Sequence, residues 1–249
     1  EITWVCASVE HKLLSVLDGV RFAVIDKNSG WRGYRDLRRQ LRGHHFDVMI
    51  QMQVSARANL AGACVSAAIK LGFDKARSRD LHTMFMTDAI PAVRQQHQVQ
   101  AHLELARPLG IDAAEPAWDF PVTDDAMAFA AESLPGEQAT LLISPCSSHS
   151  HRNWLHDRYA AVADFAIEQH GMRVVLTGGP SQLETDMCAR IAQSMAQPAL
   201  NLAGQISLSQ LMGLLHRAHI VLSPDSGPAH MANALATPVV GLHACTWSI

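Results

Sequence analysis

The chain has 249 residues, of which 48% are hydrophobic and 17% charged, and its formal net charge is −3. This length suits one large domain or two domains of roughly 120 residues. The charge argues against a general nucleic-acid binder, no apolar run approaches the ~20 residues that cross a bilayer, and no signal peptide is visible.

The N-terminal half alternates between strand and helix patterns. Strands are expected at Ile2–Ala7, Phe22–Ile25 and Phe46–Ile50, and helices near His11–Leu17, at Tyr34–Leu41 and at Ser55–Ile69. This alternation predicts a parallel sheet with right-handed crossovers. A strand already begins at the second residue and another lies near the last, so we expect both ends to be cut from a longer chain or to continue into disordered residues.

The predicted helix Tyr34–Leu41 lies in a basic stretch. The arginines of this stretch are Arg32, Arg35, Arg38, Arg39 and Arg42. A solvated helix face is the commoner reason for such a run. The alternative is a patch that faces an anionic acceptor or anionic lipid headgroups. The sequence leaves both interpretations open.

Residues 74–92 look irregular and polar, which suits either the lining of a cleft or a plain connection. A helix is expected over Arg94–Leu109, where His97 and His102 fit surface or packing positions better than catalysis. Proline and sparse periodicity mark residues 110–122 as a linker. We therefore predict an N-terminal domain over residues 1–115 and a C-terminal domain over residues 116–249.

The C-terminal half shows the pattern of a second doubly wound sheet. Strands are expected at Thr140–Ser144, Arg173–Thr177, Ala199–Leu202, His219–Ser223 and Pro238–Leu242, and helices from Asp124 to Leu134 and at Leu155–Gln169, Ser181–Met195, Ser207–Arg217 and Ala229–Leu235. The nearby histidines at 149, 151 and 156 match no zinc pattern, so no metal site is predicted. Five scattered cysteines without a Cys-x-x-Cys pair fit a reduced, cytoplasmic compartment.

Two strand-to-helix turns in this half carry residues suited to phosphate or sugar. In the first, the hydroxyl and amide of Ser147 can hold phosphate oxygens and Arg152 can add a bidentate guanidinium; an exposed polar loop is the alternative. In the second, Gly179 permits close backbone approach. Glu184 either caps its helix through Ser181 or accepts hydrogen bonds from ribose hydroxyls.

The third turn is Ser223–His230, the stretch around which we expect the chain to be organised. Its prolines fix φ, Gly227 allows a positive φ, and Asp225 or Ser226 can cap the following helix. Such a loop directs amides and a helix dipole at one spot that suits an anion. Ordinary turn chemistry is the alternative. We expect all three polar turns to lie at the carboxyl edge of one sheet, which is where open α/β sheets bind ligands.

The order of these pieces resembles glycosyltransferase family nine, the ADP-heptose:lipopolysaccharide heptosyltransferases. The matching segments are Ile143–Ser147, Arg152–Trp154, Leu176–Pro180, Asn201–Gly204 and Ser223–His230. The last of them is similar to the family's Asp-Ser/Thr-Gly-x-x-His signature and is the most specific. The resemblance covers nearly the whole chain, more loosely before Leu141.

This resemblance implies a GT-B architecture, with two Rossmann-like domains that face each other across a cleft. The C-terminal domain would hold a nucleotide sugar and the N-terminal domain a lipid-linked saccharide acceptor. Transfer would be inverting, without metal or cofactor, in the cytoplasm, and peripheral contact with the inner membrane is left open. The implied donor-site residues are Arg152 near the phosphates, Glu184 at the ribose, Ile206 near the adenine, and Asp225, Ser226, Gly227 and His230 at the diphosphate and sugar. Ser147 and Gly179, from the first two turns, complete the predicted nucleotide-sugar site.

The sequence also departs from the family pattern. The family begins with a strand and a Gly-Asp turn whose Asp is thought to act as the base, whereas Ile2–Ala7 resembles the family's second strand. Gln51 stands where an Asp is common. The catalytic base is therefore unassigned and expected upstream of Glu1. Two alternatives remain: a GT-B nucleotide-sugar epimerase, and a non-catalytic relative that only binds nucleotide.

Overall fold

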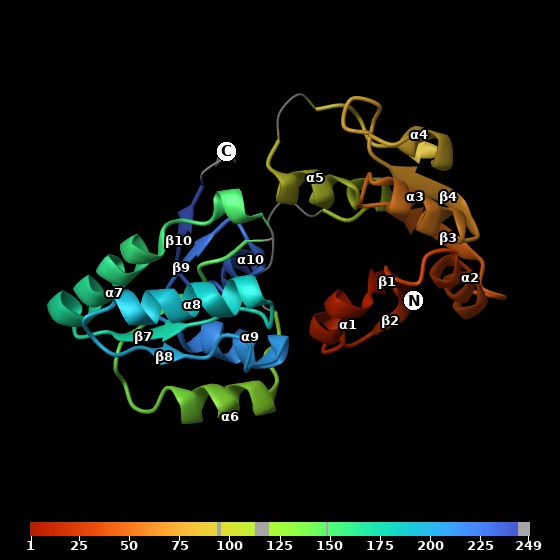
Figure 1. Cartoon of the computed structure of the whole chain (residues 1–249). Helices are drawn as coiled ribbons and strands as arrows, with labels where there is room; N and C mark the ends of the chain where they lie inside the picture. The colour runs from red at the N-terminus through yellow and green to blue at the C-terminus, as the bar shows by residue number, and fades with distance from the viewer. Residues whose placement is uncertain (94–95, 113–119, 148, 244–249) are drawn as a thin grey trace. The chain divides into compact units, whose positions relative to one another are not determined.

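The computed structural model describes residues 1–93, 96–112, 120–147 and 149–243 (Figure 1). The chain divides into two compact units, Glu1–Ala117 and Trp118–Ile249. The domain boundary predicted between residues 115 and 116 lies outside the described residues. Each unit is described by itself below.

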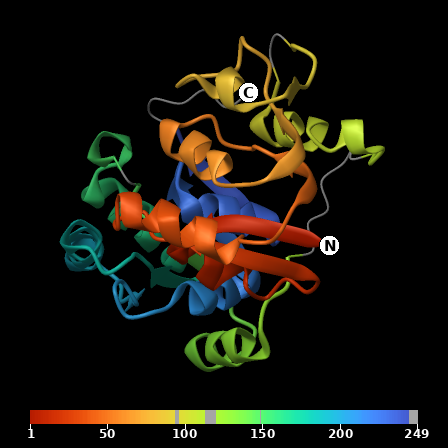
Figure 2. The same cartoon turned by 90° about the vertical axis from the view of Figure 1, so that its right-hand side faces the viewer.

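The first unit contains two parallel sheets. One pairs β1 (Ile2–Ala7) with β2 (Val20–Ile25), seen side by side in Figure 2, and the other has the order β3-β4-β5, with bounds Phe46–Ile50, Ala67–Gly72 and Asp88–Ala89. The parallel direction is confirmed, but the prediction of one sheet is wrong for the described residues. The alternation of strands and helices fixes strand direction and leaves open which strands are neighbours.

Six helical segments accompany these strands: α1 (Ser8–Leu14), α2 (Trp31–Gln40), α3 (Ala56–Ala63), α4 (His82–Phe85), α5 (Gln98–Glu104) and η1 (Arg107–Leu109). The helix predicted to reach Ile69 ends at Ala63 instead. Ile69 and Leu71 are paired in β4 with Val48 and Ile50 of β3. The small residues of this segment look helical in sequence beyond the point where the helix ends. The segment forms a strand there because sheet pairing overrides local propensity.

Two apolar clusters hold the first unit together. One joins Ala23 of β2 to Leu37 and Leu41 at α2 and to Met49 of β3. The other packs Leu71 and Phe73 against residues of α5 and of the segment before it. The first cluster is the reason that the two sheets belong to one compact unit.

A buried histidine ties α3 to the end of β4. The fully buried His82 accepts a hydrogen bond at Nε2 from the amide of Phe73 (3.3 Å), so its proton lies on Nδ1, which donates to Oδ1 of Asn59 (2.9 Å). The amide nitrogen of Asn59 in turn donates to the carbonyl of Asp80 (2.9 Å). Burial lowers the pKa of His82 below its usual value.

This network predicts an acid-sensitive first unit. Unfolded His82 takes up a proton near pH 6.5 while the native residue resists it, so stability is complete above that pH and falls as the pH drops below it. His102, whose pKa burial also lowers, adds to the effect. Urea unfolding should show a free energy of unfolding that falls between pH 7.5 and 5.5, with a slope of at most about 1.4 kcal/mol per pH unit for each histidine. His82→Gln should flatten the slope, and an unchanged slope would contradict this account.

The second unit contains one five-stranded parallel sheet of order β10-β9-β6-β7-β8. Its strands are β6 (Thr140–Ile143), β7 (Arg173–Leu176), β8 (Leu200–Asn201), β9 (Ile220–Pro224) and β10 (Val239–Leu242). Its helical segments are α6 (Asp124–Ser133), η2 (Ser150–Arg152), α7 (His156–His170), α8 (Gln182–Ser194), α9 (Leu208–Arg217) and α10 (Gly227–Ala234). Every predicted strand and helix of this half is confirmed, with ends that shift by one or two residues.

Alternate residues of the central strands serve opposite faces of this sheet. Leu141 and Ile143 of β6 pack with α7 and α8 on one face, while Leu142 packs with α6, α9 and α10 on the other (Figure 1). Both faces are therefore buried, as is typical of a parallel sheet in an α/β fold. This leaves the edge where the strands end as the place for polar turns.

Candidate functional site

The polar turns of the second unit follow neighbouring strands. In the strand order, β9, β6, β7 and β8 are adjacent and parallel, so their carboxyl ends lie at one edge of the sheet. The turns that contain Asp225, Ser147, Gly179 and Ile206 follow these four strands. The expectation that the three polar turns share one edge is confirmed, and this edge is where open α/β sheets bind ligands.

A cluster of three charged or ionisable side chains joins two of these turns. Nη1 of Arg152 lies 3.5 Å from Oδ2 of Asp225, and Nε2 of His230 lies 3.3 Å from Oδ1 of the same carboxylate. Arg152 and Asp225 are partly buried, whereas the side chain of His230 is 73% exposed. The structure thus brings Arg152, from the turn after β6, to the turn after β9, leaving the guanidinium access to solvent.

The turn after β9 differs from expectation in two details. Ser226 is the N-cap of α10 without a side-chain capping bond, because its hydroxyl pairs with that of Ser223 (2.9 Å). Gly227 does not adopt a positive φ. A Cβ on Gly227 would meet only Cε of Met231, at 4.0 Å. No contact among the described residues therefore requires a glycine here, and the space beside it is available to a ligand.

Ser147 is engaged within its own loop. Its amide donates to Oδ1 of Asn153 (2.7 Å), and its hydroxyl donates to the carbonyl of His149 (2.9 Å). Both groups were predicted to hold phosphate oxygens, and here both fix the loop that presents Arg152. Asn153, which lies in the matching segment Arg152–Trp154 but was assigned no role there, is the partner that shapes this turn.

Glu184 also makes internal hydrogen bonds. Its carboxylate accepts from the amide of Gly179 (2.8 Å) and from the hydroxyl of Ser181 (2.6 Å), while the Ser181 hydroxyl accepts from the Glu184 amide (3.4 Å). The capping interpretation is therefore the one that the structure contains. A Cβ on Gly179 would lie 2.8 Å from the Glu184 carboxylate, so the glycine permits this contact.

Most of the remaining residues at this edge of the sheet are unsuited to catalysis. Burial, and then the charge of Glu184, raises the pKa of Cys146 to about 11, so this thiol stays protonated and is a poor nucleophile. Ile206 is half-buried and packs on the cluster formed by α6 and α9.

The Oγ1 of Thr177, at the end of β7, is buried and has no hydrogen-bond partner among the described residues. Its place just before two glycines was the sequence signal for a polar group at this edge.

The two histidines of the predicted Arg94–Leu109 helix have structural roles. Nδ1 of His97 caps α5 by accepting from the amide of Val99 (3.3 Å), and His102 packs against Phe73. Gln51 is buried, and its side-chain amide donates to the carbonyl of Gln53 (3.1 Å). Within the described ranges no group of three or more His, Cys, Asp or Glu side chains is placed to hold a metal. The helices that the structure describes include none long and apolar enough to cross a membrane.

Comparison with known proteins adds a family to this geometry. Residues 34–248 match the family described as Glycosyltransferase family 9 (heptosyltransferase). The chain is 35% identical to the lipopolysaccharide core heptosyltransferase OpsX of Haemophilus influenzae over 98% of its own length and 70% of that protein.

Solved structures of similar fold include a glycosyl transferase family 9 protein from Veillonella parvula, with a TM-score of 0.83, 20% identity, and coverage of 97% of this chain and 71% of that one. Another is E. coli heptosyltransferase WaaC with ADP-2-deoxy-2-fluoro heptose, with a TM-score of 0.80, 19% identity, and coverage of 99% and 80%.

Proposed function

Because the chain belongs to glycosyltransferase family 9, a family of heptosyltransferases with the GT-B type of fold, we propose that it moves a heptose from ADP-heptose to a lipopolysaccharide core acceptor. Its curated relative OpsX is named as a lipopolysaccharide core heptosyltransferase. These similarities favour a heptosyltransferase over the nucleotide-sugar epimerase and over a non-catalytic relative.

The observation that carries the proposal is the meeting of Arg152 and Asp225 at 3.5 Å. They come from turns far apart in sequence, at the edge where this class of sheet binds ligands. A guanidinium fork matches a diphosphate, and the N-terminus of α10 begins two residues after Asp225. A helix N-terminus favours negative charge.

The donor would use this edge as follows. Arg152 and the first amides of α10, near Ser226 and Gly227, take the diphosphate. Asp225 holds the guanidinium and accepts hydrogen bonds from sugar hydroxyls, with His230 beside it. The ribose and adenine extend along the edge, over Gly179 and Glu184 toward Ile206. Ser147 acts in this scheme by shaping the loop that carries Arg152.

We propose an inverting transfer that needs no metal ion. The leaving group is a nucleoside diphosphate whose charge grows as the glycosidic bond breaks. Arg152 and the amides of α10 can stabilise that charge, and donors fixed in place before the reaction are the most effective at this. A base must also remove the proton of the acceptor hydroxyl; no described residue is assigned to that role.

The acceptor side completes the proposal. The first unit would take the lipid-linked saccharide, and the protein would work in the cytoplasm with peripheral contact at the inner membrane, where such an acceptor is anchored.

An assay with purified heptose-deficient lipopolysaccharide core and ADP-heptose tests this function. We expect ADP release that depends on the acceptor and persists in EDTA, and a product whose anomeric configuration, read by NMR, is opposite to that of the donor. Conversion of ADP-heptose to an epimer without acceptor would instead identify an epimerase. ADP binding without turnover would identify a non-catalytic relative.

A further inference from the structure

One face of α2 combines an exposed aromatic ring with positive charge. Trp31, Arg35 and Arg38 are spaced i, i+4 and i+7 and therefore share one face of the helix. Arg32 and Arg39 flank this stripe, and all five residues are exposed. The opposite face packs into the unit through Gly33 and Leu37, which are buried. The helix is thus fixed in orientation, with its arginines outward.

The arginines of this face are almost free of acidic partners. Among the described residues only Arg39 has one, Asp36 at 3.3 Å. The side chains of Arg32, Arg35, Arg38 and Arg42 make no hydrogen bond or ion pair within the described part of the chain. A solvated helix face normally interleaves both signs of charge, and this face carries a single aspartate in a chain whose net charge is −3. Such a local excess is stabilised by an external anion.

The exposed Trp31 indicates what kind of anion. Its side chain is 77% exposed and touches only Tyr34 among described aromatic rings, at 5.8 Å between centroids. Leaving a large ring in water is unfavourable, whereas the headgroup region of a membrane accommodates its apolar body and its N–H together. A soluble phosphate would contact the arginines alone, whereas a membrane surface would contact both the arginines and Trp31.

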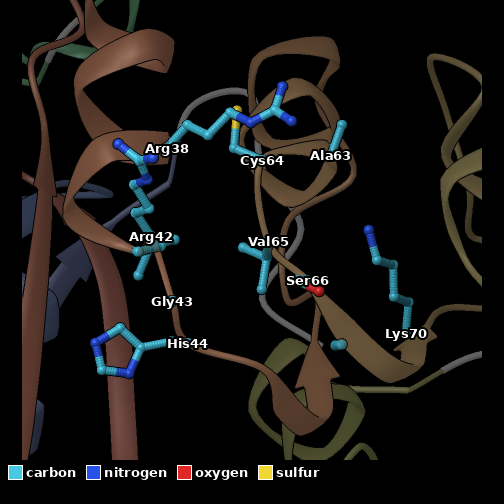
Figure 3. Close-up of a pocket in the computed structure, with 11 residues that line it drawn as sticks. Arg38, Arg42, Gly43, His44, Ala63, Cys64, Val65, Ser66 and Lys70 are labelled. Atoms are coloured by element: carbon cyan, nitrogen blue, oxygen red, sulfur yellow. The ribbon is translucent and has the colours of Figure 1, made fainter.

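A hollow at the end of α2 extends the cationic surface. It has a volume of about 620 Å³ and includes Arg38, Arg42, His44, Ser66 and Lys70 in its lining. Figure 3 shows Arg38 and Arg42 entering from the α2 side, opposite Ser66 and Lys70. Nζ of Lys70 is held by the carbonyl of Gly62 (3.2 Å). The Ser66 hydroxyl already pairs with Nδ1 of His45 (2.8 Å), so the hollow offers chiefly its cations to one phosphate headgroup.

We propose that the outward face of α2, with this hollow, docks the protein on a bilayer of anionic lipids. Trp31 lies in the headgroup region, the arginines contact lipid phosphates, and the hollow takes one headgroup. The surface deepens the proposed function, since it would hold the enzyme where a lipid-linked acceptor is anchored. The docking itself needs neither donor nor acceptor.

Vesicle sedimentation tests the proposal. The protein should bind phosphatidylcholine vesicles only when phosphatidylglycerol is included, and high salt should release it. Each arginine near such a surface is worth roughly a fivefold change in partitioning, so Arg35→Gln/Arg38→Gln should weaken binding about 25-fold. Brominated lipids should quench the emission of the wild type more than that of Trp31→Phe.

Arg107→Gln/Arg158→Gln is the matched control, because it removes the same charge from exposed positions on other helices. It should bind vesicles nearly as well as the wild type, and circular dichroism should show all variants folded. Equal losses in both double variants, binding to neutral vesicles, or binding to heparin but not to vesicles would overturn the proposal. Because the assay contains no ADP or acceptor, these outcomes are independent of whether the proposed transfer reaction is correct.

Discussion

Replacing Arg152 with alanine is expected to weaken ADP binding by roughly 10- to 100-fold, the largest functional effect of any single change in the second unit. A hydrogen bond to a charged group contributes about 1.5–3 kcal/mol, and the Arg152 side chain lies at the sheet edge 3.5 Å from Asp225, with part of its surface open to solvent. Isothermal titration calorimetry with ADP and with ADP-heptose measures the loss.

Two variants separate charge from geometry. Arg152→Lys keeps the charge and loses the fork, so its affinity should fall between those of the wild type and the alanine variant. Arg158→Ala removes an exposed arginine on α7 and should bind ADP normally. If Arg152→Ala binds ADP as tightly as Arg158→Ala does, the assignment of this edge to the diphosphate is wrong.

Replacing Asp225 is an independent test of the same cluster. We expect Asp225→Ala to weaken binding as well, because the carboxylate fixes both Arg152 and His230 before the donor arrives. Tighter ADP binding by that variant would mean the opposite, that the carboxylate competes with the diphosphate for the guanidinium. In that case Asp225 would act on the sugar alone.

The second unit could be predicted from sequence almost element by element, whereas in the first unit β1, β2 and β3 were predicted but the start of β4 was predicted as helix. Strands such as β6 and β7 are short, fully apolar and bounded by turn residues, which leaves little ambiguity. In the first unit, residues 56–72 contain many small residues that suit helix and strand alike. There the pairing of Ile69 with Val48 decides the structure, and this long-range contact has no local signature.

The site shows the same division. Sequence order and spacing were enough to predict that the turns of Arg152 and Asp225 share an edge, because adjacent parallel strands must end together. The roles of Ser147 and Glu184 were less accessible, since a hydroxyl or carboxylate that suits a ligand suits a neighbouring amide equally well. In the structure both side chains make hydrogen bonds within the chain. Their roles become clear only once these hydrogen-bond partners, and Asn153 beside Ser147, are known.

Gly213 offers the strongest test of how the second unit is packed. It lies on α9, where a Cβ would fall 2.1 Å from the backbone carbonyl oxygen of Ala126 on α6. That contact can be relieved only by moving one helix away from the other, because a backbone atom cannot rotate aside. Gly213→Ala should therefore cost roughly 3 kcal/mol from overpacking, against a gain of about 1 kcal/mol in helix propensity.

Thermal unfolding by circular dichroism should show this as a melting temperature lower by several degrees, with the helix content of the native state retained. Gly227→Ala is the matched control, since a Cβ there meets nothing closer than 4.0 Å. It should leave the melting temperature nearly unchanged and weaken ADP binding. Gly213→Ala should instead lower the melting temperature and bind ADP normally at temperatures where it is still folded. If Gly213→Ala is as stable as the wild type, α6 and α9 must be further apart than the structure places them. The helix layer that supports β9 and the Asp225 turn would then be placed wrongly as well.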